Sequence, residues 1–118
     1  MNEPPFLSVV VPVFNERDNV TPLINEITAA LRGLTTFEIV YIDDCSRDDT
    51  LDVLKRLKTE VPELRVIRHI SQSGQSTAVR TGVKAARGEW TATLDGDGQN
   101  DPADIPARAC TCSFCVKH

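Results

Sequence analysis

The sequence lacks several features that would place it in a common functional class. No apolar run approaches the roughly 18 residues that a membrane-spanning helix needs, and the opening residues, MNEPPFLS, lack the basic segment of a signal peptide. Basic residues are fewer than acidic ones, 13 against 17, and the resulting net charge of −4 disfavours a non-specific nucleic-acid-binding protein. We therefore expect a cytoplasmic protein with no nucleic-acid partner.

Two glycine-rich phosphate-binding motifs are also missing. The sequence contains no Gly-x-x-x-x-Gly-Lys-Ser/Thr and, after the first apolar segment, no Gly-x-Gly-x-x-Gly. These absences disfavour a Walker-type site and a dinucleotide-binding site. There is no internal repeat or low-complexity linker, and 118 residues with 41% hydrophobic and 25% charged content predict one globular domain.

Strand-like and helix-like patterns alternate along the chain. The apolar, β-branched segment 7–14 predicts a strand buried on both faces, and segments 37–42, 64–69 and 90–94 predict three further strands. Helical stripes lie between them. We expect the first helix to begin at Thr21 and Pro22, the second to use Ser46 and Asp49 as a capping box, and the third to end at Gly88. This order predicts an α/β fold with a mostly parallel, doubly wound sheet.

Each predicted strand is followed by a polar loop, and in open α/β sheets ligands bind beyond the carboxyl ends of the strands. The loops read NERDN, DDCSRDD, SQSGQ and DGDGQND. In the last loop, Asp95, Asp97 and Gln99 offer the oxygen ligands that Mg²⁺ and Mn²⁺ prefer, and such ions commonly bridge carboxylates to phosphates. The loop therefore predicts a metal-bound nucleotide diphosphate, with an ordinary aspartate-glycine turn as the alternative.

Two interpretations remain open for the residues after the first two strands. Asp43 and Asp44 could form the loop that leads into the next helix, or could accept hydrogen bonds from a nucleobase or a ribose. Pro12, Val13 and Glu16 raise the same choice between a structural and a ligand-binding role.

Other conspicuous residues have a structural interpretation. We expect His69 to pack at a strand end and Arg80 to be a solvated helix residue. Cys45 follows an acidic pair, which disfavours a reactive thiolate. The last nine residues contain three cysteines, which we interpret as part of a frayed tail rather than a zinc site, because zinc sites usually join ligand pairs across a longer loop: Cys110, Cys112 and Cys115.

Four segments in this order and spacing resemble the inverting family 2 glycosyltransferases of the GT-A fold, and among them the polyprenyl-phosphate sugar transferases. The segments are VVPVFNE, VYIDDCSRDDT, SGQSTAVRTGVKAARG and TLDGDGQNDPADIP. The likeness runs from about Leu7 to Pro106. It implies that residues 1–106 form a nucleotide-sugar-binding part and that residues 107–118 are an atypical, cysteine-rich tail.

The resemblance implies a role for each candidate residue. The nucleotide-diphosphate sugar is expected to contact Pro12, Val13, Glu16, Asp44 and Asp95. Mg²⁺ or Mn²⁺ is expected to be held against the diphosphate by Asp95, Asp97 and Gln99. Cys45 replaces the glycine of the family's Asp-Asp-Gly-Ser pattern, which is expected to restrict the loop.

The implied activity is that of a hexosyltransferase, which moves a sugar with inversion from a nucleotide sugar to a lipid phosphate. Family members continue beyond this likeness with the acceptor site and further catalytic positions. We therefore expect a truncated or frameshifted donor half, with no assigned catalytic residue and an exposed sheet edge that favours a homo-oligomer. The alternatives are an inactive nucleotide-binding or interaction module and a receiver-like signalling domain.

Overall fold

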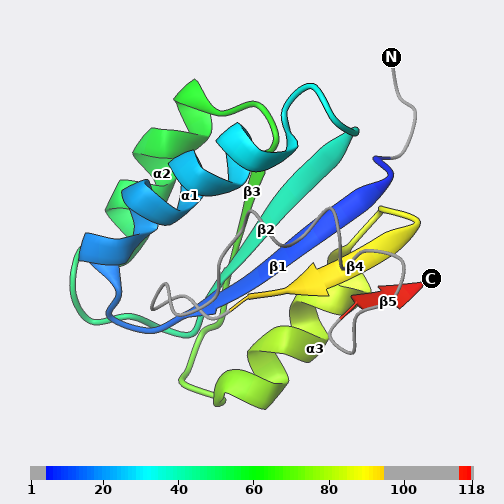
Figure 1. The fold of residues 1–118 in the computed structure, drawn as a ribbon. Helices are drawn as coiled ribbons and strands as arrows, with labels where there is room; N and C mark the ends of the chain where they lie inside the picture. Colours follow the sequence, from blue (N-terminus) through cyan, green and yellow to red (C-terminus); the bar gives the residue numbers. More distant parts are fainter. Residues whose placement is uncertain (1–4, 95–114, 118) are drawn as a thin grey trace.

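The computed structural model describes residues 5–94 and 115–117. Strands and helices alternate along the chain, as the sequence predicts (Figure 1). The elements are β1 (Leu7–Val13), α1 (Arg17–Leu31), β2 (Phe37–Asp43), α2 (Thr50–Glu60), β3 (Leu64–Arg68), α3 (Gln75–Ala85), β4 (Trp90–Thr93) and β5 (Cys115–Lys117).

The strands form one sheet in the order β3-β2-β1-β4-β5, in which the first four are parallel and β5 runs antiparallel to β4. Helices α1 and α2 cover one face of the sheet and α3 covers the other (Figure 1). The predicted doubly wound sheet is therefore confirmed. A receiver-like domain would have β1 between β2 and β3, whereas here β1 lies between β2 and β4, so this signalling alternative is wrong.

Burial on both faces explains the continuous apolar character of the central strands. Every residue of β1 and β2 is buried. Successive side chains of a strand point to opposite faces. Val9 and Val11 accordingly join the core under α1 and α2, while Val10 joins the smaller core under α3. Gly82 lets α3 approach the sheet closely, since a Cβ at this position would lie 2.3 Å from a methyl carbon of Val10.

Helix α1 begins earlier than the sequence predicts. The expected start at Thr21 is wrong, because the helix begins at Arg17 and contains Pro22 within it. Glu16 occupies the N-cap position, and its carbonyl accepts a hydrogen bond from the Asn19 amide at 3.0 Å. No side chain caps this end, so the local capping signals did not decide where the helix starts.

The start of α2 also differs from its predicted capping box. Asp49 is the N-cap, but its side chain makes no capping hydrogen bond. The Ser46 hydroxyl instead accepts from the Asn15 amide at 2.9 Å, and Asp48 accepts from the Thr50 amide at 2.9 Å. The loop before α2 is therefore fastened to the loop before α1, and these contacts between loops replace the local box.

Two predictions near the end of the described chain are corrected. Helix α3 ends at Ala85, before Gly88, which instead lies so close to β1 that a Cβ there would meet the Ser8 backbone nitrogen at 2.7 Å. The described part of the tail, Cys115–Lys117, is not frayed but pairs with β4, which is therefore not an open edge. Among the described residues, no helix is long and apolar enough to cross a membrane.

Candidate functional site

The candidate site lies at the carboxyl edge of the parallel strands. From β1 the chain continues to β2 and β3 on one side, and β4 lies on the other side of β1. This reversal of strand order makes the end of β1 the topological switch point, where ligands of open α/β sheets bind. The loops that follow β1, β2 and β3 meet at this edge (Figure 1).

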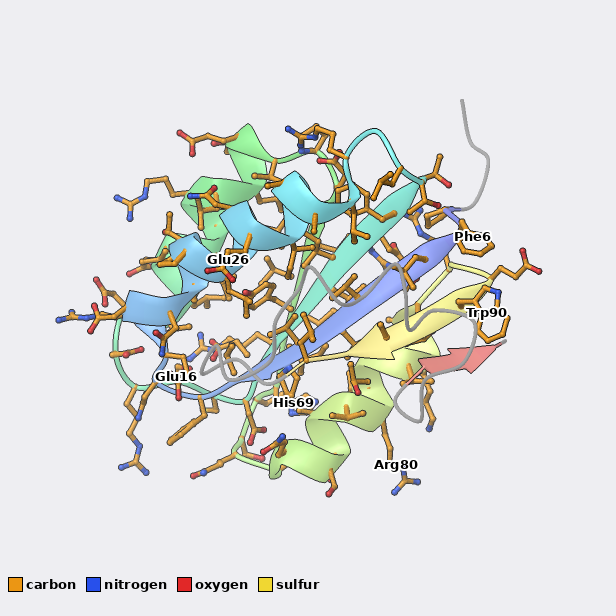
Figure 2. All side chains as sticks on the ribbon, in the orientation of Figure 1. Phe6, Glu16, Glu26, His69, Arg80 and Trp90 are labelled. Atoms are coloured by element: carbon orange, nitrogen blue, oxygen red, sulfur yellow. The ribbon has the colours of Figure 1, made fainter. Side chains whose placement is uncertain are left out.

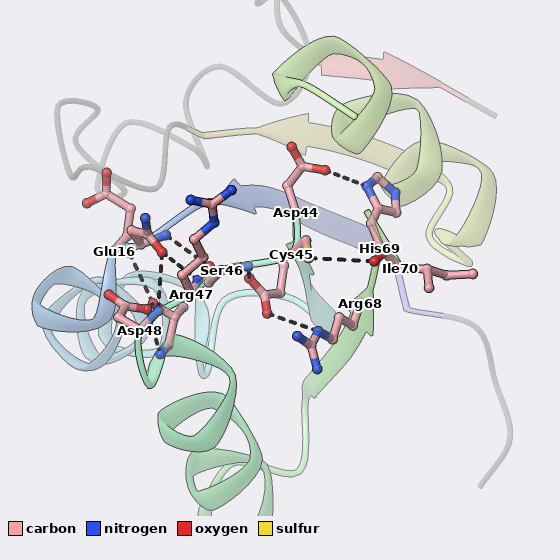
Figure 3. Close-up of polar contacts among 12 residues, drawn as sticks. Glu16, Asp44, Cys45, Ser46, Arg47, Asp48, Arg68, His69 and Ile70 are labelled. Atoms are coloured by element: carbon pink, nitrogen blue, oxygen red, sulfur yellow. Dashed lines mark hydrogen bonds and ion pairs between the residues drawn. The ribbon is translucent and has the colours of Figure 1, made fainter. Parts of the chain in front are cut away.

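Asp44, which directly follows β2, is the most extensively bonded side chain at this edge. Its Oδ1 lies 2.8 Å from His69 Nδ1 and accepts from the Ser73 amide at 2.8 Å (Figure 3). Its Oδ2 accepts from the Gly74 amide at 2.9 Å. The Asp44 amide donates to the Val13 carbonyl at 2.9 Å, so the same residue also joins the ends of β1 and β2.

The surroundings of Asp44 favour its ionised form. Burial raises the pKa of its carboxyl, since only 4% of the residue is exposed, but the hydrogen bonds from His69, Ser73 and Gly74 outweigh this, and the pKa lies below its ordinary value. The donor amides immediately precede α3, which begins at Gln75. Asp44 thus places a fixed negative charge at the N-terminus of α3, where the helix dipole stabilises it.

His69 is the site residue whose contacts the sequence analysis missed. Its packing at the end of β3 is confirmed, because only 13% of its side chain is exposed. Its second ring nitrogen, Nε2, lies 2.8 Å from the Thr81 hydroxyl on α3. The parallel register pairs Asp43 with Arg68, so Asp44 and His69 follow paired residues of neighbouring strands. The sequence could therefore have indicated that Asp44 and His69 lie close together, because each follows the last residue of its strand.

Asp43 has a structural role of its own. It is completely buried, and its Oδ1 accepts from the Ser46 amide at 3.0 Å. Its Oδ2 makes no hydrogen bond within the described residues and lies 3.9 Å from Arg68 Nε (Figure 3). Between Asp44 and Ser46, Cys45 adopts a φ of 64°, in the left-handed region that favours glycine.

The candidate residues of the first loop are split between the core and the surface. Pro12 and Val13 are buried in the last two positions of β1. Glu16 is partly exposed, and its Oε2 accepts from the Asn19 side chain at 2.7 Å. Figure 3 shows Glu16 beside α1 and Asp44 beside β3, with the loop that contains Arg47 between them. The structure thus brings the loops together at one edge without joining these two carboxylates.

The predicted metal ligands Asp95, Asp97 and Gln99 lie outside the described residues. The last residue before them, Leu94, is 3% exposed and donates its amide to the Val10 carbonyl at 3.0 Å. β4 therefore leads the chain toward the same edge as β1. Within residues 5–94 and 115–117, no group of three or more His, Cys, Asp or Glu side chains is arranged to hold a metal ion.

The curated relatives that match this chain are sugar transferases. It is 42% identical over 103 residues to a dodecaprenyl-phosphate galacturonate synthase of Rhizobium johnstonii, covering 86% of this chain and 30% of that protein. It is 40% identical over 100 residues to a dolichol-phosphate mannosyltransferase of Pyrococcus furiosus, covering 85% of this chain and 28% of that protein. The chain thus spans roughly 30% of the length of these relatives.

Solved structures show the same fold. The mannosyltransferase PcManGT of Pyrobaculum calidifontis, in complex with GDP-Man and Mn²⁺, matches 90% of this chain with 31% of its own, with a TM-score of 0.76 and 24% identity. TarS 1-349 of S. aureus, in complex with UDP-GlcNAc, matches 88% of this chain with 30% of its own, with a TM-score of 0.75 and 28% identity. Residues 8–108 also match the family described as glycosyl transferase family 2, and the chain therefore belongs to this family.

Proposed function

We propose that residues 1–106 bind a nucleotide-diphosphate sugar as the donor part of a glycosyltransferase, and that residues 107–118, of which Cys115–Lys117 pair with β4, take no part in this binding. The transfer inverts the anomeric carbon and delivers the sugar to a polyprenyl or similar lipid phosphate at the cytoplasmic face of a membrane. The observation that carries the proposal is the ionised Asp44 carboxylate, fixed at the switch point of a family 2 sheet. The relatives named above, which act on polyprenyl phosphates, support the acceptor.

Asp44 is suited to recognise the nucleoside. A carboxylate only accepts hydrogen bonds, so its partners are N–H groups of a base or hydroxyl groups of a ribose. Because protein donors already hold both oxygens, Asp44 meets its ligand without first being ordered. We assign the other contacts with the nucleotide sugar to Pro12, Val13, Glu16 and Asp95. Pro12 and Val13 are buried, so they would contact it at the carboxyl end of β1.

The chemistry of the last loop fits a divalent metal ion. Asp95, Asp97 and Gln99 supply two carboxylates and an amide, which are the hard oxygen ligands of Mg²⁺ and Mn²⁺. When bound, the ion would supply positive charge to the departing diphosphate. No cation from this chain is needed for that purpose, which agrees with a loop that carries only acidic charge.

The acceptor chemistry places a small demand on the protein. A phosphate monoester has its second pKa near 6, so a lipid phosphate is largely ionised at neutral pH. It therefore needs less help from a general base than a sugar hydroxyl would need.

We also propose that the chain forms a homo-oligomer through β3. Among the described residues, the outer edge of β3 has no strand partner, so two copies could associate there. Sedimentation would test this self-association.

The test is a calorimetric titration of the chain with UDP-sugars and GDP-sugars, with Mn²⁺ or Mg²⁺ and again with chelator. We expect one nucleotide class to bind with metal, and at least about tenfold weaker binding in Asp97→Ala. Glu26→Ala is the matched control, because Glu26 is exposed on α1 away from the edge (Figure 2). Failure of every nucleotide to bind would refute the proposal.

Turnover is tested separately with a polyprenyl phosphate as acceptor. Formation of a lipid-linked sugar would identify the chain as an active enzyme. Donor binding without any product would instead identify it as a nucleotide-binding module, the non-catalytic alternative. The two readouts therefore separate the donor site from the complete reaction.

A further inference from the structure

One residue, Asn15, fastens the loop after β1 to the loop after β2. Its Oδ1 accepts from the Arg47 amide at 2.8 Å and from the Asp48 amide at 3.4 Å. In the other direction, the Asn15 amide donates to the Ser46 hydroxyl at 2.9 Å. Figure 3 shows these three residues of the second loop next to Glu16, which follows Asn15 in the chain. The two loops are therefore joined in both directions at Asn15.

The second loop is in turn fixed to the end of β2. The Ser46 amide donates to Asp43 Oδ1 at 3.0 Å, and Asp43 is completely buried. Asp44 lies between Asp43 and Ser46 in the chain. The contact of Asn15 with Ser46 therefore sets the position of the first loop relative to Asp44.

The backbone conformation of Asn15 restricts which residue types fit this position. Its φ is 53°, in the left-handed region, and among the described residues other than glycine only Cys45, in the loop after β2, also has a positive φ. Asparagine and aspartate adopt this conformation more readily than other residues with a side chain, and they also carry an oxygen that accepts hydrogen bonds. Backbone strain of this kind concentrates at functional sites, and here both cases lie in the two loops that Asn15 joins.

We propose that Asn15 is a positioning residue of the donor site, which holds Glu16 and Asp44 at the spacing that a nucleotide sugar requires. This inference rests on the proposed function, in which these two residues contact the donor. Glu16 and Asp44 belong to different loops, and their side chains bond to other residues, so their separation depends on how the loops are joined.

The expected size of the effect follows from the contacts of the Asn15 side chain. Loss of one such hydrogen bond changes an equilibrium constant by roughly three- to tenfold. The apparent affinity for a ligand falls with the fraction of molecules that keep the binding conformation. A second contact between the loops, from the Glu16 amide to the Thr50 hydroxyl at 3.1 Å, does not involve the Asn15 side chain. We therefore expect the chain to fold without that side chain and to bind the donor more weakly.

The first measurement tests the contact itself, by NMR of the Arg47 amide. Asn15→Gly removes the acceptor oxygen and keeps the left-handed backbone, which glycine adopts freely. In this variant we expect the Arg47 amide proton to shift upfield and to exchange faster with water than in wild type. An unchanged shift and exchange rate would overturn the proposal.

The second measurement is the calorimetric affinity for UDP-glucose and GDP-mannose with Mg²⁺. It is made where urea titration shows each variant to be fully folded, so that a change in global stability alone leaves the affinity unchanged. We expect Asn15→Gly to bind roughly three- to tenfold more weakly than wild type. Thr36→Val is the matched control and should bind as wild type does. The Thr36 hydroxyl also accepts from a distant amide, that of Phe6 at 2.9 Å, but at the opposite end of the sheet.

Asn15→Asp tests whether the acceptor oxygen is the part of the side chain that matters. Aspartate keeps this oxygen and tolerates the left-handed conformation. Because it adds a negative charge near an anionic ligand, it is compared with wild type in about 0.5 M salt, where this charge is screened. We expect its affinity to lie within about twofold of wild type in that salt, while Asn15→Gly remains weaker.

The outcomes distinguish this inference from the function on which it rests. Equal affinities of wild type and Asn15→Gly would overturn the positioning role and leave the donor site intact. An Asn15→Asp variant as weak as Asn15→Gly in the same salt would also overturn that role, since the acceptor oxygen would then make no difference. Failure of wild type to bind any nucleotide sugar with metal would refute the proposed function and this inference with it.

Discussion

The strongest stability prediction concerns Glu38, which lies near the start of β2, at the end of the sheet away from the candidate site. Only 3% of this residue is exposed. Its Oε2 accepts from the Ser8 hydroxyl at 2.6 Å and the Arg87 amide at 2.7 Å, and its Oε1 accepts from Arg65 Nη1 at 2.9 Å and Arg87 Nε at 3.3 Å. One buried carboxylate thus joins β1, β3 and the segment after α3.

Glu38→Gln keeps the shape of the side chain and removes the charge. An amide has one acceptor oxygen, so one pair of donors would face an NH₂ group. A hydrogen bond to a charged group contributes about 1.5–3 kcal/mol, and the bond from the Arg87 side chain is worth less because that side chain is 64% exposed. We expect the free energy of unfolding to fall by about 2–4 kcal/mol, which corresponds to a melting temperature lower by roughly 10 °C.

The assay is urea unfolding of both proteins at pH 7, followed by circular dichroism. Glu63→Gln is the matched control, because Glu63 pairs at 2.8 Å with Arg32, whose side chain is 58% exposed, and surface pairs of this kind contribute less than about 1 kcal/mol. A Glu38→Gln variant within about 0.5 kcal/mol of wild type would refute the reasoning, as would equal losses in both variants.

Three other predictions concern single features. Burial raises the pKa of Glu38, but its hydrogen bonds outweigh this effect, and the pKa lies below the ordinary 4.5. The stabilisation by the Glu38 carboxylate is therefore complete above that pH and is lost on acidification. In urea titrations, the stabilities of wild type and Glu38→Gln should thus converge below about pH 4.5. Gly82→Ala should destabilise by about 1–2 kcal/mol in urea, because the new Cβ would lie 2.3 Å from a Val10 methyl; an unchanged midpoint would contradict the close packing of α3. Cys45→Gly should be more stable than Cys45→Ala by up to about 1 kcal/mol, because only glycine adopts a φ of 64° without strain; the reverse order would be evidence against a strained loop.

The fold was predictable because its main signals are local. The two central strands, β1 and β2, are buried on both faces, so each one appears as a mostly apolar run whatever it pairs with. The start of α1 was not predictable in the same way. Thr21 and Pro22 are good local signals, but the Glu16 amide donates to the Thr50 hydroxyl at 3.1 Å, and this contact with α2 helps to hold an earlier start.

The candidate site was predictable as a place but not as a set of contacts. The carboxyl edge follows from the order of strands and helices alone. Side chains alternate between the two faces of a strand, so the exact end of β2 decides which of the two adjacent aspartates turns toward α3. Sequence analysis locates strand ends only to within a few residues. The structure ends β2 at Asp43, which packs in the core, and so leaves Asp44 on the side of His69.

For Asp44, the structural and the ligand-binding interpretations of the sequence do not exclude each other. Asp44 does lie at a helix N-terminus, but the helix is α3 and not α2, which follows Asp44 in the sequence. The amides from which Asp44 accepts belong to Ser73 and Gly74, just before α3. A carboxylate has about four acceptor positions, and His69, Ser73 and Gly74 fill three of them, so Oδ2 can still accept from a ligand. The contacts that stabilise the fold are thus the ones that fix the direction of the remaining acceptor, and under the proposed function a variant that freed Asp44 from them would lose nucleotide affinity without losing the carboxylate.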